Sequence, residues 1–203
     1  MSIRLHAGDL AADVRYGTAV AVDTETLGLN PHRDRLCLVQ LSGGDGNADI
    51  VQIAPGQREA PRLAALLADP AVVKIFHFAR FDIAMLEKNL QVATTPLYCT
   101  KIASKLVRTY TDRHGLKDLV AELLGVELSK QQQSSDWAAN ELSPQQLAYA
   151  ASDVLHLHAL KDKLDAMLER EGRRAFADAA FGFLPVRARL DLAGFGEIDI
   201  FAH

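Results

Sequence analysis

Five residues in three separated segments of the 203-residue chain have side chains suited to phosphoryl chemistry. Asp23 and Glu25 follow an apolar run, Asp82 interrupts a second apolar segment, and Tyr149 lies four residues before Asp153. If the first run is a strand, the carboxylates of Asp23 and Glu25 leave the same face. In a helix, Tyr149 and Asp153 lie one turn apart on one face. The pattern therefore predicts that the acids meet at one site.

Clustered carboxylates are typical ligands of hard divalent cations such as Mg²⁺, whose remaining ligands are waters and substrate phosphate. Two ions about 3.5–4 Å apart can bridge the attacking and leaving oxygens of a phosphoryl displacement. A carboxylate within an apolar segment, such as Asp82, is costly unless a metal, a cation or hydrogen bonds compensate it. A phenol with a usual pKa near about 10 is a poor base at neutral pH, but it can hold an attacking water in line. The combination predicts a metal-dependent nuclease in which Tyr149 orients the nucleophile.

Each segment alone has a simpler structural interpretation. Asp23 and its neighbours also fit a strand end that runs into a turn and caps a helix. Asp82 alone fits an acid in the first turn of a helix. Tyr149 and Asp153 alone fit a buried aromatic and a solvated acid. The order and contexts of the three segments favour the nuclease interpretation.

That order resembles the DEDD exonuclease superfamily, in its tyrosine-bearing branch. The sequence DxE comes first, HxxxxD within an apolar segment follows, and YxxxD lies late in the chain. Residues 134–160 resemble the third exonuclease motif of the ribonuclease D family with its preceding Ser-Asp-Trp segment, and GLKDL at 115–119 fits the lead-in helix. The resemblance covers roughly residues 15–165. It implies a 3′-to-5′ exonuclease that uses two divalent ions, Mg²⁺ or Mn²⁺.

Position by position, the resemblance also implies roles for individual residues. The implied metal ligands are Asp23, Glu25, Asp82 and Asp153. Tyr149 is implied to position the attacking water. His77 matches a family position that faces the substrate cleft, although a histidine satisfied within the core is the structural alternative. Leu29 stands at the spacing of a leucine that wedges between the two bases of a dinucleotide in DEDD oligoribonucleases, and its alternative is an ordinary core leucine.

Length and charge narrow the kind of relative that we expect. With 203 residues and a net charge of −4, the chain fits one domain without the broad basic surface of a protein that wraps long RNA. We expect no HRDC domain of the kind that follows the catalytic domain in full-length ribonuclease D proteins. A short tyrosine-type member resembles the nano-RNase C group, which cleaves RNA dinucleotides to nucleoside 5′-monophosphates in the last step of RNA decay. That resemblance implies a homo-oligomeric ring, an octamer, with short single-stranded DNA as a further candidate substrate.

Two other functions remain open at this point. One is a general ribonuclease D-like 3′-to-5′ exonuclease that acts on longer RNA or single-stranded DNA. The other is a non-catalytic nucleic-acid-binding scaffold. The role of a basic cluster is also open, because it fits either the binding of a terminal phosphate or an ordinary solvated helix face. Its members are Lys101, Lys105, Arg108, Arg113 and His114.

The pattern of expected strands and helices around these residues predicts an α/β protein, a mixed sheet flanked by helices as in ribonuclease H-like folds. Periodicity predicts strands at 18–23, 36–41, 48–53 and 72–76. It predicts helices at about 60–68, 80–90, 100–108, 115–124, 144–170 and 173–181. GGDGN at 43–47 is typical of a hairpin turn, and Ser143 with Pro144 is typical of a helix start.

The C-terminal segment and the cysteines complete the expectations. We expect residues 1–181 to form the exonuclease domain and the apolar extension 182–203 to contact a neighbouring subunit, so that its deletion changes the mass in solution. The two cysteines, Cys37 and Cys99, fit buried small hydrophobes. With no leader and no run of about 18 apolar residues, we expect a cytoplasmic protein without a membrane segment.

Overall fold

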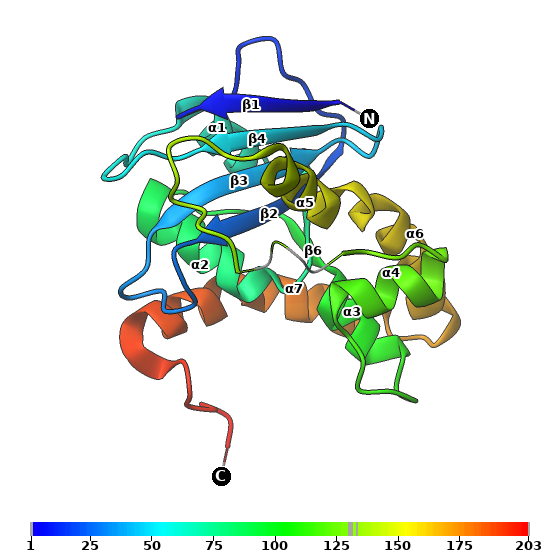
Figure 1. Ribbon diagram of the computed structural model, residues 1–203. Helices are drawn as coiled ribbons and strands as arrows, with labels where there is room; N and C mark the ends of the chain where they lie inside the picture. Colours follow the sequence, from blue (N-terminus) through cyan, green and yellow to red (C-terminus); the bar gives the residue numbers. More distant parts are fainter. Residues whose placement is uncertain (1, 130–131, 133, 203) are drawn as a thin grey trace.

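A six-stranded mixed sheet organises the computed structural model, which describes residues 2–129, 132 and 134–202 (Figure 1). The strands are β1 (Ile3–Ala7), β2 (Ala19–Thr26), β3 (Leu36–Ser42), β4 (Ala48–Gln52), β5 (Val73–Phe76) and β6 (Leu97–Cys99). Their order across the sheet is β1-β4-β3-β2-β5-β6. β3 runs antiparallel to β2 and β4, whereas the other three pairs are parallel. The predicted α/β class is confirmed.

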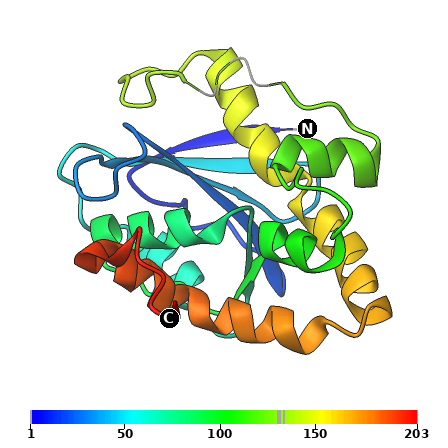
Figure 2. The same ribbon diagram turned by 90° about the horizontal axis from the view of Figure 1, so that it is seen from below.

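Helices cover both faces of this sheet. They are α1 (Pro61–Ala68), α2 (Ala79–Leu90), α3 (Thr100–Val107), α4 (Leu116–Leu124), α5 (Pro144–Leu155), α6 (Leu157–Arg170), α7 (Arg174–Leu190) and a short π-helical turn, η1 (Asp191–Phe195). α5 packs on β2, β3 and β4 from one side, and α2 and α7 lie on the other side (Figure 2). Among the described residues, no helix is both long enough and apolar enough to cross a membrane.

The four predicted strands are present, and the hairpin turn at 43–47 joins β3 to β4 as expected. Two strands were not predicted. β6 has only three residues, too few to show a period. β1 is a half-exposed edge strand, and its pairing with β4 is supported by Arg4, which donates two hydrogen bonds to Asp49. That partner lies 45 residues away in the sequence, so no local pattern in β1 could reveal it.

Two helix predictions at the C-terminal end were wrong in extent. The helix predicted at 144–170 is divided at His156, where the backbone leaves ideal helical angles at φ −104° and ψ −5°. The helix predicted at 173–181 continues to Leu190 although Pro185 stands inside it. Leu184 and Ala188 are buried on that continuation, so tertiary packing outweighs the cost of the proline. The expected boundary between residues 181 and 182 falls inside this helix.

Two apolar clusters fill the two sides of the sheet. The large cluster joins strands β2 to β6 to helices α1 to α7. The smaller one lies between the sheet and α5 and contains Cys37, Leu38, Ile50, Trp137 and Ala150. This small cluster supports the helix that carries Tyr149 and Asp153.

Candidate active site

The first two acids of the candidate site lie where β2 loses one of its neighbours. The pairing of β2 with β5 ends at Ala21, whereas its pairing with β3 continues to the end of the strand. The β5 side of the strand is therefore open beside Asp23 and Glu25. Because side chains alternate along a strand, these two acids share one face and Thr24 leaves the other. A cleft about 710 Å³ in volume contains all three residues in its lining.

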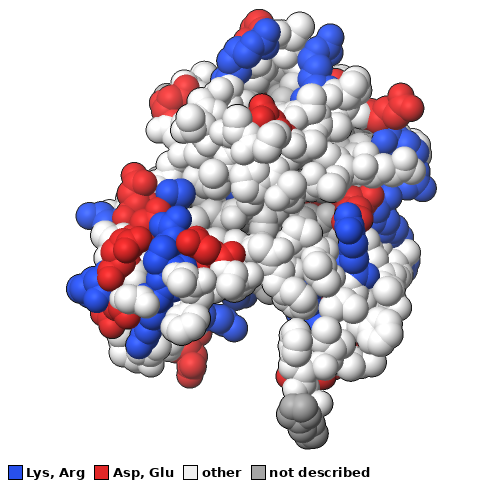
Figure 3. Space-filling view, turned by 180° about the vertical axis from the view of Figure 1, so that it is seen from behind, with Lys and Arg blue, Asp and Glu red and all other residues white. Residues whose placement is uncertain are grey.

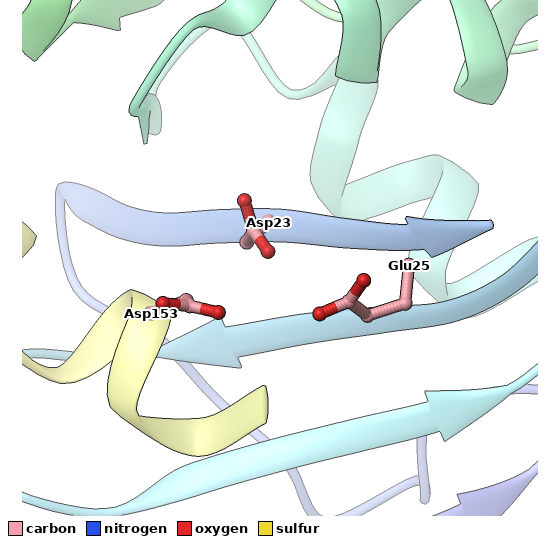
Figure 4. A group of neighbouring side chains, drawn as sticks. All are labelled: Asp23, Glu25 and Asp153. Atoms are coloured by element: carbon pink, nitrogen blue, oxygen red, sulfur yellow. The ribbon is translucent and has the colours of Figure 1, made fainter. Parts of the chain in front are cut away.

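α5 delivers the third acid to this face. The helix begins with a capping box, in which Ser143 Oγ accepts a hydrogen bond from the backbone N–H of Gln146 and the Gln146 side chain accepts one from Ser143. Ala150 packs against the sheet and leaves Asp153 beside the strand acids. Carboxylate oxygens of Asp23, Glu25 and Asp153 lie within 4.8 Å of one another (Figure 4). The structure thus brings together acids that are up to 130 residues apart in the chain.

Asp82 lines the same cleft but lies outside this group of three acids. It stands in the first turn of α2 and is buried, and Thr24 Oγ1 donates a hydrogen bond to its Oδ1 at 2.6 Å. Phe78, the N-cap residue of α2, has a left-handed backbone with φ +68°. A strained residue of this kind persists only where the surrounding structure holds it. The turn at Phe78 and the bond from Thr24 together fix the position of Asp82.

The electrostatics of the acid cluster disfavour four negative charges. Burial, followed by repulsion from Asp82, Asp153 and Glu25, raises the pKa of Asp23 well above its usual range. Burial and repulsion from Asp153 raise the pKa of Glu25 to about 9. Burial raises the pKa of Asp82 and of Asp153 to about 7. The cluster is therefore a site that a cation would stabilise strongly.

Tyr149 lies one helical turn before Asp153 and lines the same cleft. Its ring packs on buried Trp137 with the ring centroids 5.9 Å apart. Burial and the nearby negative charges raise the pKa of the Tyr149 phenol above its usual value. The hydroxyl therefore keeps its proton at neutral pH and can both donate and accept a hydrogen bond in the cleft.

A loop after β2 places apolar side chains in the cleft. Leu27 and Leu29 line it with 53% and 86% of their surface exposed, so Leu29 is not a core leucine. Asp34 holds the loop by accepting a hydrogen bond from the backbone N–H of Asn30 at 2.9 Å. A Cβ on Gly28 would lie 2.4 Å from the Asp34 carboxylate, so this close packing requires glycine.

His77 lines the cleft and is also hydrogen-bonded within the fold. Thr100 Oγ1 donates to the carbonyl oxygen of Phe76, so the same hydroxyl must accept its 2.9 Å bond from His77 Nδ1–H. Burial and the charge of Lys101 lower the pKa of His77 to about 3. The imidazole is therefore neutral at physiological pH, with Nε2 left as a hydrogen-bond acceptor.

The predicted basic cluster divides into separate environments. Of its five members, only Lys101 lines the cleft, where Lys117 joins it. Lys101 Nζ lies 4.2 Å from the centroid of the Phe78 ring. Arg108 is fully buried and pairs with Glu122. The five residues therefore form neither one phosphate-binding patch nor one solvent-exposed helix face.

Sequence reasoning missed several residues that shape the site. Thr24 stands between the two strand acids, and alternation alone places it on the opposite face, toward α2. Trp137 was noted only as part of a matching segment, although it forms the surface beneath Tyr149. Lys117 lines the cleft from the start of α4, but an isolated lysine in a helix has no local signal that distinguishes it.

Comparison with known proteins places this geometry among nucleases. A profile of the 3′-5′ exonuclease family matches residues 6–169. Ribonuclease D of Gluconacetobacter diazotrophicus is 42% identical over 76% of this chain and 39% of that protein, so the chain spans about two fifths of this curated relative. The structure is similar to Brucella melitensis NrnC with bound Mg²⁺ (59% identity, TM-score 0.96, covering 100% of both chains). It is also similar to Brucella melitensis NrnC bound to pGG (60% identity, TM-score 0.97, covering 100% of this chain and 99% of that one).

Proposed function

Because the chain belongs to the 3′-5′ exonuclease family, we propose that it is an exoribonuclease that cleaves very short RNA, above all dinucleotides, to nucleoside 5′-monophosphates. Its sheet and helices form the ribonuclease H-like fold expected for the family. The relatives that match along their whole length include one bound to pGG, which supports a dinucleotide as the substrate.

The observation that carries the proposal is the shared cleft of the three clustered carboxylates, Tyr149 and Leu29. Carboxylates that hold divalent ions and a phenol that can orient a water are groups that support phosphodiester hydrolysis, and an exposed leucine in the same cleft offers an apolar surface for a base. The cleft volume of about 710 Å³ lies in the range of about 300–1,000 Å³ typical of sites that enclose small ligands. A chemical centre and a limited binding space thus occur together.

The donor set fits a hard divalent cation such as Mg²⁺ or Mn²⁺. The donors are all carboxylate oxygens within 4.8 Å of one another. Burial, and then mutual repulsion, raises their pKa values, and a bound cation would offset both effects. Asp23, Glu25 and Asp153 would hold the ions, with Asp82 as the fourth acid of the site. Two bound ions supply activation of the attacking water and neutralisation of charge on the scissile phosphate.

The remaining residues orient the reactants. Tyr149, protonated at neutral pH, holds the attacking water by hydrogen bonding, and Trp137 fixes the plane of its ring. Leu29 contacts the bases, and His77 Nε2 accepts a hydrogen bond from a substrate hydroxyl. Lys101 and Lys117 add positive charge at the cleft for the substrate phosphates. Hydrolysis then releases the 3′ nucleotide with its 5′ phosphate.

Surface charge supports a short substrate. On the face shown in Figure 3, acidic and basic side chains are intermixed and form no broad basic surface. A protein that binds long RNA by neutralising many phosphates requires such a surface. Among the described residues that line the cleft, Lys101 and Lys117 are the basic side chains.

We propose residues 1–181 as the exonuclease domain and 182–203 as the contact with neighbouring subunits of a homo-oligomeric ring, made by the exposed part of this segment, since Leu184 and Ala188 pack in the domain core. Apolar side chains at the C-terminal end support this assignment, since Val186, Phe195, Ile198, Ile200 and Phe201 are exposed. Figure 3 shows that this end protrudes and carries few charges. An octamer remains the expected subunit number.

The test is turnover of 5′-labelled RNA of two to seven nucleotides with Mg²⁺, with Asp23→Ala run in parallel. We expect the dinucleotide to be cleaved fastest and the Asp23→Ala variant to be inactive. Equal cleavage at every length would instead support a general exonuclease. Unaltered cleavage by Asp23→Ala would contradict catalysis at this site and favour a binding protein. A deoxydinucleotide in the same series tests short DNA as a substrate.

A further inference from the structure

A buried amide lies beside the acid cluster without a hydrogen-bond partner. Gln40 stands in the middle of β3 with 0% of its surface exposed, and neither its Nε2 nor its Oε1 makes a hydrogen bond to any described residue. Each buried polar group left unpaired costs about 1–3 kcal/mol. An apolar side chain of similar size would avoid this cost, so the amide at this position needs an explanation.

The strand register locates this amide. Gln40 lies directly opposite Asp23 on β2 and opposite Ile50 on β4. Directly opposed residues of antiparallel strands point to the same face, with their Cβ atoms about 4.5–5.5 Å apart. Gln40 therefore shares the face of the acid cluster, and Figure 4 shows the three carboxylates in front of the sheet on this side.

Most side chains around this position are apolar, but the small cluster also contains Trp137, whose Nε1 likewise makes no hydrogen bond to a described residue, and the buried Ser42 donates its hydroxyl to Asn47. Leu38, Ile50 and Ala150 are buried members of the small cluster between the sheet and α5. Along β2, the polar residues on the same face as Gln40 are Asp23 and Glu25, and α5 adds Asp153 beside them. Trp137 Nε1 is a donor and can pair only with Gln40 Oε1, whereas Gln40 Nε2 needs an acceptor, and the residue directly opposite it is Asp23, whose carboxylate is a strong acceptor when ionised.

We propose that Gln40 is a positioning residue for the metal site, an inference that rests on the proposed function. Asp23 would hold a divalent ion in its ionised form, and Gln40 Nε2 would then donate a hydrogen bond, directly or through one water, to the Asp23 carboxylate. This bond fixes the carboxylate in the orientation that binds metal. Outer hydrogen bonds of this kind typically contribute about 10–100-fold to metal affinity or activity.

The experiment compares Gln40→Leu and Gln40→Met with the wild-type full chain. Mn²⁺ and Mg²⁺ affinities are measured by calorimetry without substrate, and thermal unfolding is recorded in chelator. Both variants should unfold at the same or a higher temperature than wild type without metal, because a buried unpaired amide is gone. Their metal affinity should fall about 10–100-fold. With saturating Mg²⁺, kcat should fall while KM for the dinucleotide changes little.

Thr94→Val is the matched control. Thr94 is also buried, its Oγ1 also lacks a partner among the described residues, and it does not line the cleft. This variant should keep wild-type metal affinity. Unchanged affinity in a folded Gln40→Leu or Gln40→Met variant would overturn the inference. Because calorimetry uses no RNA, that result is distinct from a failure of the dinucleotide preference.

Discussion

At the level of single residues, the site combines groups whose ionisation depends on one another. Asp23, Glu25 and Asp153 are close enough to share an ion, and their burial makes three simultaneous negative charges unfavourable. Tyr149 is outside the group of acids and remains neutral in their field. The acids and the tyrosine should therefore respond differently to substitution, to pH and to metal.

Tyr149→Phe separates orientation from metal binding. The variant keeps the ring that packs on Trp137 and removes only the hydroxyl, so the fold and the metal affinity should stay near wild type. We expect kcat to fall on the order of 10²-fold, because the attacking water is no longer held in line. Steady-state kinetics and Mn²⁺ calorimetry check this. A collapse of metal affinity in Tyr149→Phe would show that the assigned role is wrong.

The stability of the metal-free protein should fall as pH rises. The pKa values of Glu25 (about 9), Asp82 and Asp153 (both about 7) lie above their ordinary values, so between about pH 5 and 9 the folded chain binds more protons than the unfolded chain. This contribution to stability is present at low pH and is lost as pH rises through the folded-state pKa values. We expect Tm in chelator to decrease over this window, measured by scanning calorimetry.

Metal should reverse this trend. Ion binding competes with protons, so Mg²⁺ should raise Tm more at about pH 8 than at about pH 5.5, and turnover should increase over the same range. Glu25→Gln removes a carboxyl group whose pKa is raised to about 9 and should flatten the dependence of Tm on pH in chelator. A metal-free Tm that falls with pH as steeply in Glu25→Gln as in the wild type, or that does not fall in either protein, would contradict this origin.

Leu29→Ala tests the base contact. Since 86% of the Leu29 surface is exposed, its truncation should leave Tm unchanged. Loss of apolar contact worth about 1.5 kcal/mol with a base corresponds to a rise of roughly tenfold in KM for the dinucleotide. Leu5→Ala, at a half-exposed position on the β1 edge, is the control and should change neither quantity. An unchanged KM for Leu29→Ala would remove the leucine from the binding site.

At the level of elements, the site depends on where β2 and α5 begin and end. β2 continues beyond its pairing with β5, which exposes Asp23 and Glu25 to the cleft. α5 places Tyr149 and Asp153 in register with them, and its first turn is fixed by the capping box of Ser143 and Gln146. Substitutions in the capping box should therefore affect catalysis by shifting α5, which carries Tyr149 and Asp153.

Ser143→Ala measures this dependence. Loss of an N-cap side chain typically costs about 1 kcal/mol, which corresponds to a decrease in Tm of roughly 2–4 °C for a chain of this size. Gln146→Ala should have a similar effect, and the double variant should cost less than the sum because the two bonds form one unit. Thermal unfolding of all three variants checks this. Strict additivity would show that the two bonds act independently.

At the level of the whole molecule, the C-terminal segment is anchored and then exposed. Arg80 of α2 binds the carboxylate of Asp191 and the carbonyl oxygen of Gly196, which holds η1 against the domain. Beyond Gly196, Ile198, Ile200 and Phe201 are exposed. An anchored segment with an apolar end is suited to contact with a second copy of the chain.

Truncation after Gly196 tests this contact. The wider deletion of 182–203 would also remove Leu184 and Ala188 from the core, so it would confuse folding with assembly. We expect the chain without residues 197–203 to remain folded and to have a smaller mass in light scattering. Thermal unfolding serves as the control for folding. An unchanged mass would exclude this segment as a subunit contact.

The sequence by itself determined the features that depend on local order. Alternation placed Asp23 and Glu25 on one face of a strand, helical spacing paired Tyr149 with Asp153, and Ser143 marked the start of α5. These predictions needed only the side-chain period of a strand or helix and the preference of serine for the N-cap position. The order of the motifs then identified the family, because such an order is rarely repeated by unrelated chains.

The tertiary structure alone decided the features that depend on which segments meet. It placed Asp82 in the cleft beside the group of three acids with a hydrogen bond from Thr24, exposed Leu29, buried Arg108 against Glu122, and left Gln40 without a described partner opposite Asp23. Each outcome is set by partners that are distant in the chain or in another element. Sequence spacing describes the direction in which a side chain leaves its own backbone, whereas burial and pairing depend on the packing of all the elements together.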